Sequence, residues 1–370
     1  MIKSFYSLLM AGVLSLLVCT NADAQNKRAS NSNTKAVKGD NNNRPHYDVD
    51  VNTPRRYKKP TDKRMDYRVL KNYPIKQGDK CNAIGYDEIT NNIYICMPTK
   101  VAVMDMTKDG FVSMLDIAGV GGIAFFKQTH QAYITNTKKG TISMVDLHGH
   151  QVSKELKVGD GPTTIFADNF SKKLYVCNEQ SKDISVVDIK TFTVINTIKI
   201  HAKAKAMVSD NKGKIYIAVV DRNEVLRLDV KTMKTDKGYY TGDGRGPSAL
   251  AIDTVTRQLY VGCLNRYMPI ISLDSSKVIQ EIAIPTGCGG VVYDPFFKTI
   301  LATGIDGRLT LMRQGPKGTV EFINDIHVAP GARLITMNEK SHRAYMVAFM
   351  AGDKKSKMPE SKMDVLMVGN

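Results

Sequence analysis

The chain has 370 residues, 42% of them hydrophobic, so it is long enough to bury one large core or two ordinary ones. Its formal net charge at pH 7 is +16, and it contains no Trp, which excludes cofactors made from Trp side chains. After residue 24 no stretch approaches the roughly 20 apolar residues that a membrane helix needs, which excludes an integral membrane span.

Residues 1–24 have the pattern of a signal peptide. An early basic residue precedes an apolar run over residues 8–18, and the Ala-Asp-Ala tripeptide at 22–24 has the small-x-small form that a signal peptidase cleaves. We therefore expect export to the periplasm or cell surface, with Gln25 as the first mature residue. An outer-membrane lipoprotein anchored through Cys19 is the alternative, although the valine before this cysteine is larger than the residue usually found there.

Residues 25–65 form a basic segment with few large apolar side chains. They contain 11 Lys or Arg residues against four Asp. A segment of this composition cannot bury enough apolar surface to fold, so we expect a disordered linker. Its simplest role is to space the domain from the envelope, and the alternative is an arm that binds a polyanion.

From residue 66 onward the same pattern of short strands returns every 39 to 44 residues. The clearest copy, KKLYVCNEQSKDISVVDIKTFTVINTIKI at residues 172–200, contains three strand-like runs. Aligning the copies on one residue of the LYVCN strand gives seven positions. These are Tyr94, Tyr133, Tyr175, Tyr216, Tyr260, Leu301 and Tyr345. A period near 40 predicts a β-propeller with one four-stranded blade per copy.

The two ends of the repeat predict how the ring closes. After residue 343 the chain supplies only two strands, AYMVAF and MDVLMV, so the last blade lacks its outermost strand. The segment YRVLKNYPI, at residues 67–75, reads as a strand without a blade of its own. Pairing the two would leave no open blade edge. We therefore expect an all-β fold over residues 66–370, a monomeric seven-bladed β-propeller in which an N-terminal strand completes the C-terminal blade.

Ten carboxylates recur in phase with the repeat. One set precedes the aligned strand and the other follows the next strand: Asp87, Asp168, Asp210, Asp253 and Asp294, then Asp105, Asp146, Asp188, Asp229 and Asp274. Each stands where a strand ends and a turn begins, and there an Asp side chain bonds nearby backbone N–H groups. We interpret them as turn formers and not as catalytic residues.

The remaining motifs give no sign of catalysis, a metal or a cofactor. The chain has no C-x-x-C, G-x-S-x-G, H-E-x-x-H or phosphate-cradling glycine loop, and His148 and His150 fall in a tight turn. Isolated cysteines in strands are usually small buried hydrophobes, with a pairing of Cys263 and Cys288 as the alternative. The cysteines concerned are Cys81, Cys96, Cys177, Cys263 and Cys288.

The runs LYVCN, DISVVD and VINTIKI, preceded by GDGPTTIFAD, resemble the YVTN β-propeller repeat, and residues 133–136 read Tyr-Ile-Thr-Asn. The resemblance covers about residues 67–370 and weakens in the sixth copy, which lacks the Tyr and the Asn. It implies a seven-bladed fold in a secreted, periplasmic or surface protein of a microbe, with binding roles commoner than catalysis. Some relatives resemble lactonases, and some of the YncE type are thought to bind single-stranded DNA.

The start of each first strand should lie at the mouth of the central channel, where propellers usually bind ligands. The aligned residues there are Asn82, Gly121, Thr163, Lys205, Ser248, Gly289 and Arg333. Lys205 and Arg333 are long cations among small residues, which predicts an anion-binding mouth with Asn82, Thr163 and Ser248 as neutral hydrogen-bond donors. The alternative is that either cation points into bulk water.

The loops after the second strands share this face and add further cations. These are Lys100, Lys138, Lys139, Lys182, Arg222, Arg266 and Arg308. Tyr267 is the one aromatic residue expected to be exposed there, which is thin support for nucleic-acid binding, since that needs several stacking rings. A long polar loop at residues 351–362 is a further candidate contact.

These patterns favour an exported, non-catalytic propeller that binds an envelope protein or an anionic polymer, such as a glycan, through its basic mouth. The first alternative is a lactonase-like hydrolase or isomerase that acts on a small lactone or sugar acid in the channel. The second is single-stranded nucleic-acid binding.

Overall fold

A computed structural model describes residues 66–75, 80–316, 318–352 and 361–370. Within these residues the regular elements are β-strands, apart from two 3-10 turns, η2 (Met106–Lys108) and η3 (Lys127–Thr129). No helix in the described residues has the length and hydropathy to cross a membrane. The predicted signal peptide and basic linker, residues 1–65, lie outside the described part of the chain.

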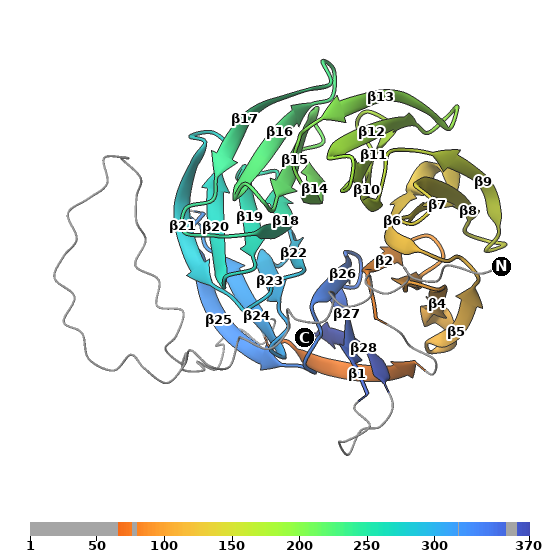
Figure 1. Ribbon diagram of the computed structural model, residues 1–370. Helices are drawn as coiled ribbons and strands as arrows, with labels where there is room; N and C mark the ends of the chain where they lie inside the picture. The colour runs from red at the N-terminus through yellow and green to blue at the C-terminus, as the bar shows by residue number, and fades with distance from the viewer. Residues whose placement is uncertain (1–65, 76–79, 317, 353–360) are drawn as a thin grey trace, which may run out of the picture. The chain divides into compact units, whose positions relative to one another are not determined.

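Seven four-stranded antiparallel sheets stand around a central axis, which confirms the predicted seven-bladed β-propeller (Figure 1). Six blades are built from four consecutive strands, which follow one another from the axis outward. Blade 1 contains β2 (Ala83–Asp87), β3 (Asn92–Cys96), β4 (Val101–Asp105) and β5 (Phe111–Leu115). Blade 2 contains β6 (Val120–Phe126), β7 (Gln131–Asn136), β8 (Thr141–Asp146) and β9 (Val152–Lys157). Blade 3 contains β10 (Pro162–Asp168), β11 (Lys173–Asn178), β12 (Asp183–Asp188) and β13 (Thr193–Lys199).

The next three blades follow the same order. Blade 4 contains β14 (Ala204–Ser209), β15 (Lys214–Val219), β16 (Glu224–Asp229) and β17 (Lys234–Tyr240). Blade 5 contains β18 (Pro247–Asp253), β19 (Gln258–Cys263), β20 (Tyr267–Ser272) and β21 (Lys277–Ala283). Blade 6 contains β22 (Val291–Asp294), β23 (Thr299–Thr303), β24 (Arg308–Gln314) and β25 (Val320–His327).

Blade 7 joins the two ends of the described chain, as predicted. It contains β26 (Leu334–Asn338), β27 (Arg343–Met350) and β28 (Lys362–Gly369), and β1 (Arg68–Ile75) is its outermost strand. β1 runs antiparallel to β28, so Arg68 lies opposite Gly369 and Ile75 lies opposite Met363. The last blade therefore presents β1 at its outer edge, and the ring is closed by hydrogen bonds between segments that are almost 300 residues apart.

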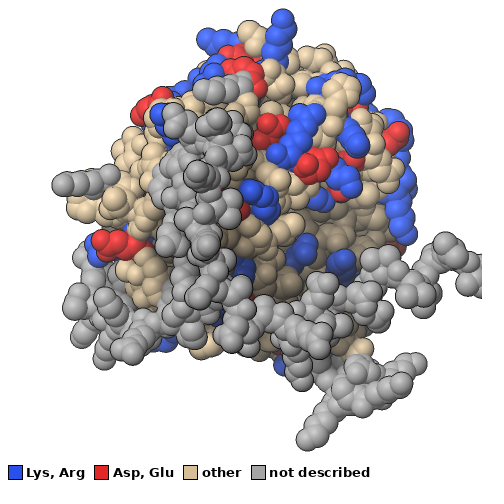
Figure 2. Space-filling view, turned by 60° about the vertical axis from the view of Figure 1, so that its left-hand side comes forward, with Lys and Arg blue, Asp and Glu red and all other residues tan. Residues whose placement is uncertain are grey.

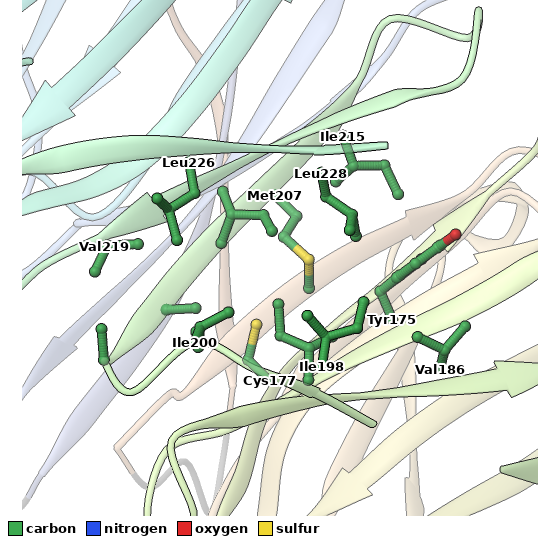
Figure 3. Packing of buried hydrophobic residues seen from close by; sticks show 14 of the residues in the cluster. Tyr175, Cys177, Val186, Ile198, Ile200, Met207, Ile215, Val219, Leu226 and Leu228 are labelled. Carbon is green, nitrogen blue, oxygen red and sulfur yellow. The ribbon is translucent and has the colours of Figure 1, made fainter. Parts of the chain in front are cut away.

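The second strand of each blade is buried on both faces because it stands between neighbouring blades. In β11, Tyr175 and Cys177 belong to the same core cluster as Met207 of blade 4 (Figure 3). Leu174 and Val176, which alternate with them, belong to a different cluster, shared with blade 2. An apolar side chain is therefore required at consecutive positions, which explains why these strands are unbroken apolar runs.

The recurrent carboxylates form turns as expected. Nine of the ten accept hydrogen bonds from backbone N–H groups two or three residues further along. Asp188, for example, accepts from the amides of Lys190 and Thr191, both at 3.0 Å. Asp274 instead pairs with the guanidinium of Arg257 at 2.5 Å.

Two carboxylates of the first set also join neighbouring blades. Asp168 of blade 3 accepts a hydrogen bond from the Ser209 hydroxyl of blade 4 at 2.7 Å. Asp294 of blade 6 lies 2.8 Å from His342 Nδ1 of blade 7. Both carboxylates are buried. The sequence had indicated the turns but not these contacts between blades.

The propeller has two faces, which we call the mouth face and the turn face. Each first strand runs from the mouth face to the turn face, and antiparallel pairing returns the loop between the second and third strands to the mouth face. The turns after the first and third strands lie on the turn face. His148 and His150 are in such a turn, after β8, as predicted.

The cysteines of the described chain are all buried and unpaired, so Cys263 and Cys288 form no disulfide. Burial raises the pKa of the Cys81 and Cys288 thiols to about 12, which keeps both protonated at neutral pH. A protonated, buried thiol is a poor nucleophile and metal ligand. The interpretation of these residues as small buried hydrophobes is confirmed.

Candidate functional site

A cavity of about 610 Å³ opens at the mouth face. Every blade contributes to its wall, because the residue at the start of each first strand lines it. These residues are Asn82, Gly121, Thr163, Lys205, Ser248, Gly289 and Arg333. All seven are the positions aligned from the sequence, so the repeat placed the inner ring correctly.

Small residues follow the ring because neighbouring first strands converge closely there. A Cβ atom on Gly122 would lie 2.4 Å from the carbonyl oxygen of Thr163 in the next blade, and one on Gly290 would lie 2.6 Å from Ile335. These distances are below any van der Waals contact, so a side chain at either position would push the blades apart. The small residues are therefore structural.

Four cations line the cavity, namely Lys80, Lys138, Lys205 and Arg333. Lys80 precedes β2 and Lys138 follows β7, so the cations come from blades 1, 2, 4 and 7. Among the described residues of the cavity wall there is no Asp, Glu or His. Positive charge gathered in a concave, partly enclosed site attracts anions. Sequence alignment had not indicated Lys80, because it stands in a loop outside the repeated strands.

Lys205 is held by a carboxylate from blade 3. Its Nζ lies 2.7 Å from Glu179 Oε2, and Lys203 Nζ lies 3.6 Å from the other carboxylate oxygen. Burial raises the pKa of the Glu179 carboxyl, but Lys205 and Lys203 outweigh this and hold that pKa below its usual value. Glu179 is therefore ionised at neutral pH, and a ligand anion must compete with it for Lys205.

Arg333 stands at the mouth without such a partner. Its side chain is exposed, and its guanidinium makes no hydrogen bond or ion pair within the described residues. Its backbone is fixed by blade 6, because the Thr303 hydroxyl donates to the Arg333 carbonyl oxygen at 2.5 Å. An anchored backbone with an uncommitted guanidinium suits bidentate binding of a carboxylate, sulfate or phosphate group.

The neutral residues of the ring mainly connect neighbouring blades. Asn82 Nδ2 donates to the Val120 carbonyl oxygen of blade 2 at 2.7 Å, and the Ser248 hydroxyl donates to the Cys288 carbonyl oxygen before blade 6 at 2.6 Å. The hydroxyl hydrogen of Ser248 is used in its bond, so this side chain serves the ring more than a ligand. Asn82 is exposed and uses one of the two N–H groups of its amide, so the other can still face a ligand. Thr163 Oγ1 is enclosed, with no hydrogen-bond partner in the described residues.

Of the residues predicted in the loops after the second strands, Lys138 lines the cavity, but four others do not. These are Arg222, Arg266, Tyr267 and Arg308. Arg222 donates to the Ile200 carbonyl oxygen at 2.9 Å and pairs with Glu224 at 3.3 Å. Arg308 pairs with Asp306 at 2.6 Å. These two guanidiniums are already bound within the fold, so they add little attraction for a ligand.

The expectation of an exposed ring at Tyr267 was wrong. Tyr267 is half-buried because it is the first residue of β20 and pairs with Ala283 of β21. Of the long loop at residues 351–362, residues 353–360 lie outside the described part of the chain. Figure 2 shows Lys and Arg interspersed with Asp and Glu over the side that it presents, so the positive charge there does not form a single basic field.

No family model and no curated protein matches the chain. A chain in the crystal structure of a mitotic checkpoint complex is similar over 92% of this chain and 99% of its own length, with a TM-score of 0.69 and 14% identity. A chain of the Kuenenia stuttgartiensis hydrazine synthase is similar over 63% of this chain and 78% of its own, with a TM-score of 0.53 and 22% identity. At these identities the likeness shows the fold alone, which is that of a seven-bladed β-propeller.

Proposed function

We propose that this protein is an exported, non-catalytic propeller of the YVTN-repeat type that binds an anionic segment of an envelope protein or polymer at its mouth. The observation that supports this is the cavity wall, in which the described residues include four cations and no carboxylate. The volume of about 610 Å³ is that of a small-molecule site. The segment that enters is therefore a short charged stretch, such as an acidic loop or a few uronic acid or sulfated sugar units.

The composition of the wall weighs against the two alternatives. A lactonase-like enzyme needs a general base or a metal-binding cluster, and the described lining residues include neither carboxylate nor imidazole. Single-stranded nucleic acid binds by stacking on several aromatic rings, and the same described residues include no Phe or Tyr. An anion recognised by charge and hydrogen bonds fits this wall better than either.

Replacing both ring cations should abolish most of this binding. The variant Lys205→Ala with Arg333→Ala is expected to bind an immobilised polyuronate or an acidic peptide at least about tenfold more weakly, because it loses two charge-assisted contacts. The same variant should lose partners that the native protein captures by cross-linking in cell envelopes. The matched control is Arg222→Ala with Arg308→Ala, which removes two cations of the mouth face outside the cavity and should bind as the native protein does.

A change in the opposite direction is expected from Glu179→Gln. The substitution releases Lys205 and Lys203 from their carboxylate, so affinity for the same anionic probes should rise several-fold. Equal losses in the ring variant and the control, or no gain in Glu179→Gln, would show that the mouth is not the binding site.

Export and the YVTN assignment are supported by the sequence of residues 1–24 and by the repeat. The protein recovered from the envelope fraction is expected to begin at Gln25, as N-terminal sequencing would show. A start at a lipid-modified Cys19 would support export with a tether. Protein that retains Met1 and stays in the cytoplasm would contradict export.

A further inference from the structure

The turn face carries the most exposed large apolar side chains of the described chain. Val255 is 87% exposed and Phe296 is 72% exposed, whereas no other such residue exceeds 49%. Phe170 and Ile89, at 44% and 38%, occupy the same place in their own blades. All four stand two residues after the turn carboxylate of the first strand, so the fold presents one apolar tip in each of blades 1, 3, 5 and 6.

These tips are held rigidly with their side chains outward. The amide of Val255 donates to Asp253 Oδ1 at 2.9 Å, and the amide of Phe296 donates to Asp294 Oδ1 at 2.9 Å. The Phe296 ring also stacks on His342, with 4.8 Å between ring centroids. Because the buried carboxylate holds the backbone of the turn, the apolar side chain cannot move into the core. The fold therefore keeps this side chain exposed.

Cations stand beside the apolar tips. In blades 4 and 7 the equivalent positions are Lys212 and Lys340. Two residues after the apolar tip, blades 3, 5 and 6 place Lys172, Arg257 and Lys298 in the left-handed backbone region. The five turn carboxylates of the first set are buried beneath their turns. Exposed acids in the same turns are fewer, with Glu339 exposed and Glu88 half-buried.

The turns after the third strands, on the same face, carry less net positive charge than the turns after the first strands. There, Lys108 pairs with Asp105 at 3.2 Å, and Asp274 pairs with Arg257 at 2.5 Å. Lys190 and Lys231 are exposed beside their own turn carboxylates. The turn face therefore presents separate apolar tips with cations beside them, and its exposed carboxylates include Asp109, Asp274 and Glu339, of which Asp109 and Asp274 are paired with Lys71 and Arg257.

The start of β1 lies on this face too. Arg68 pairs with Gly369, and that end of blade 7 is the end at which the Asn338 turn joins β26 to β27. Asp66 and Tyr67, which stand just before β1, therefore belong to the turn-face end of blade 7.

We propose that the turn face docks on an anionic lipid surface. Isolated apolar side chains enter the boundary between headgroups and acyl chains one by one, and neighbouring cations are attracted to anionic headgroups. A protein partner would instead favour a contiguous apolar patch at the centre of its interface, and on this face the tips are one or two blades apart. This proposal is independent of the ligand that the mouth binds.

Sedimentation with lipid vesicles tests the proposal on the protein as the cell makes it. The native protein is expected to bind vesicles of phosphatidylglycerol and phosphatidylcholine more tightly than vesicles of phosphatidylcholine alone, and less tightly as salt rises. The variant Val255→Ser with Phe296→Ser should bind at least about tenfold more weakly, since it removes the two most exposed apolar side chains. The variant Lys172→Gln with Lys298→Gln should show a weaker preference for the anionic vesicles than the native protein, because Lys212, Lys340 and the N-terminal cations remain.

The control is Tyr240→Ser with Ile305→Ser, which removes two side chains, 39% and 49% exposed, from the mouth face, at the end of β17 and after β23. It should bind vesicles as the native protein does, and every protein in the comparison has the same N-terminal residues. Equal binding by all variants would overturn the proposal, as would no binding by the native protein. A dimer that dissociates in Val255→Ser with Phe296→Ser, without vesicle binding, would assign the tips to self-association and overturn it as well.

Discussion

A chain that starts at Lys80, and so lacks β1, is expected to lose its stable fold. Tyr67, Tyr73 and Ile75 are buried in the described structure, and removing three such side chains alone costs about 6 kcal/mol. The loss also leaves the backbone of β28 without its partner along most of its length. We expect the melting temperature to fall by about 10 °C or more, or the chain to fail to fold, as circular dichroism would show.

The matched control is a chain that starts at Asp66, which keeps β1 and removes only what precedes it. This chain should melt as the full chain does. A synthetic peptide of residues 66–75, added to the chain that starts at Lys80, should restore part of the lost stability by pairing with β28. Identical melting of the two truncated chains would show that β1 does not close the ring.

Asp168→Ala is expected to destabilise the propeller by about 3 kcal/mol, far more than the same change at Asp188. Asp168 is fully buried and accepts from the Ser171 amide at 2.8 Å and from the Ser209 hydroxyl of the next blade at 2.7 Å. Its removal leaves both donors without this acceptor in the interior. Asp188 forms an equivalent turn that water can reach, so Asp188→Ala should cost about 1 kcal/mol, as urea unfolding would measure.

A double-mutant cycle identifies the contact between blades. Asp168→Ala combined with Ser209→Ala should cost clearly less than the sum of the single changes, because each removes the same hydrogen bond. Additive costs would mean that Asp168 acts only within its own turn. An equal cost for Asp168→Ala and Asp188→Ala would contradict the distinction between buried and accessible carboxylates.

The fold could be predicted because the second strand of each copy is buried in the same way. The second strand stands between two blades, so Leu174, Tyr175, Val176 and Cys177 must all be apolar, and this run marks every copy. The missing outer strand of the last copy then required a partner from elsewhere, which is β1. The turn carboxylates could also be predicted, because their hydrogen bonds are to backbone N–H groups only two or three residues away.

The contacts between blades could not be read in the same way. Asp168 and Ser209 are 41 residues apart, and nothing in the local pattern of either distinguishes a buried carboxylate from an accessible one. Asn82 and Ser248 were expected to face a ligand, and the sequence did not show that each also donates a hydrogen bond to a carbonyl group next to the neighbouring blade. The repeat predicts the position of a residue within its own blade. The hydrogen-bond partner of that residue in the next blade depends on how the two blades pack, which the repeat does not show.

The wall of the cavity was predictable only where it is made of strands. The ring from Asn82 to Arg333 was placed by the register of the repeat. Lys138 and Arg222 both stand in loops after second strands, yet Lys138 lines the cavity and Arg222 turns back to bind Ile200 and Glu224. The direction of a cation in a loop depends on which acceptors the folded protein places near it. The sequence does not show where those acceptors lie.

The place of β1 beside β28 has a consequence for the time course of folding. The first strand of the domain finds its partner only after the last strand has been synthesised, so ring closure carries the full entropic cost of a loop almost 300 residues long. Closure by so distant a pairing is slow, and until then blade 7 is incomplete. A chain that is exported, as we propose, benefits from this delay, because a translocation channel accepts an unfolded polypeptide and not a finished ring.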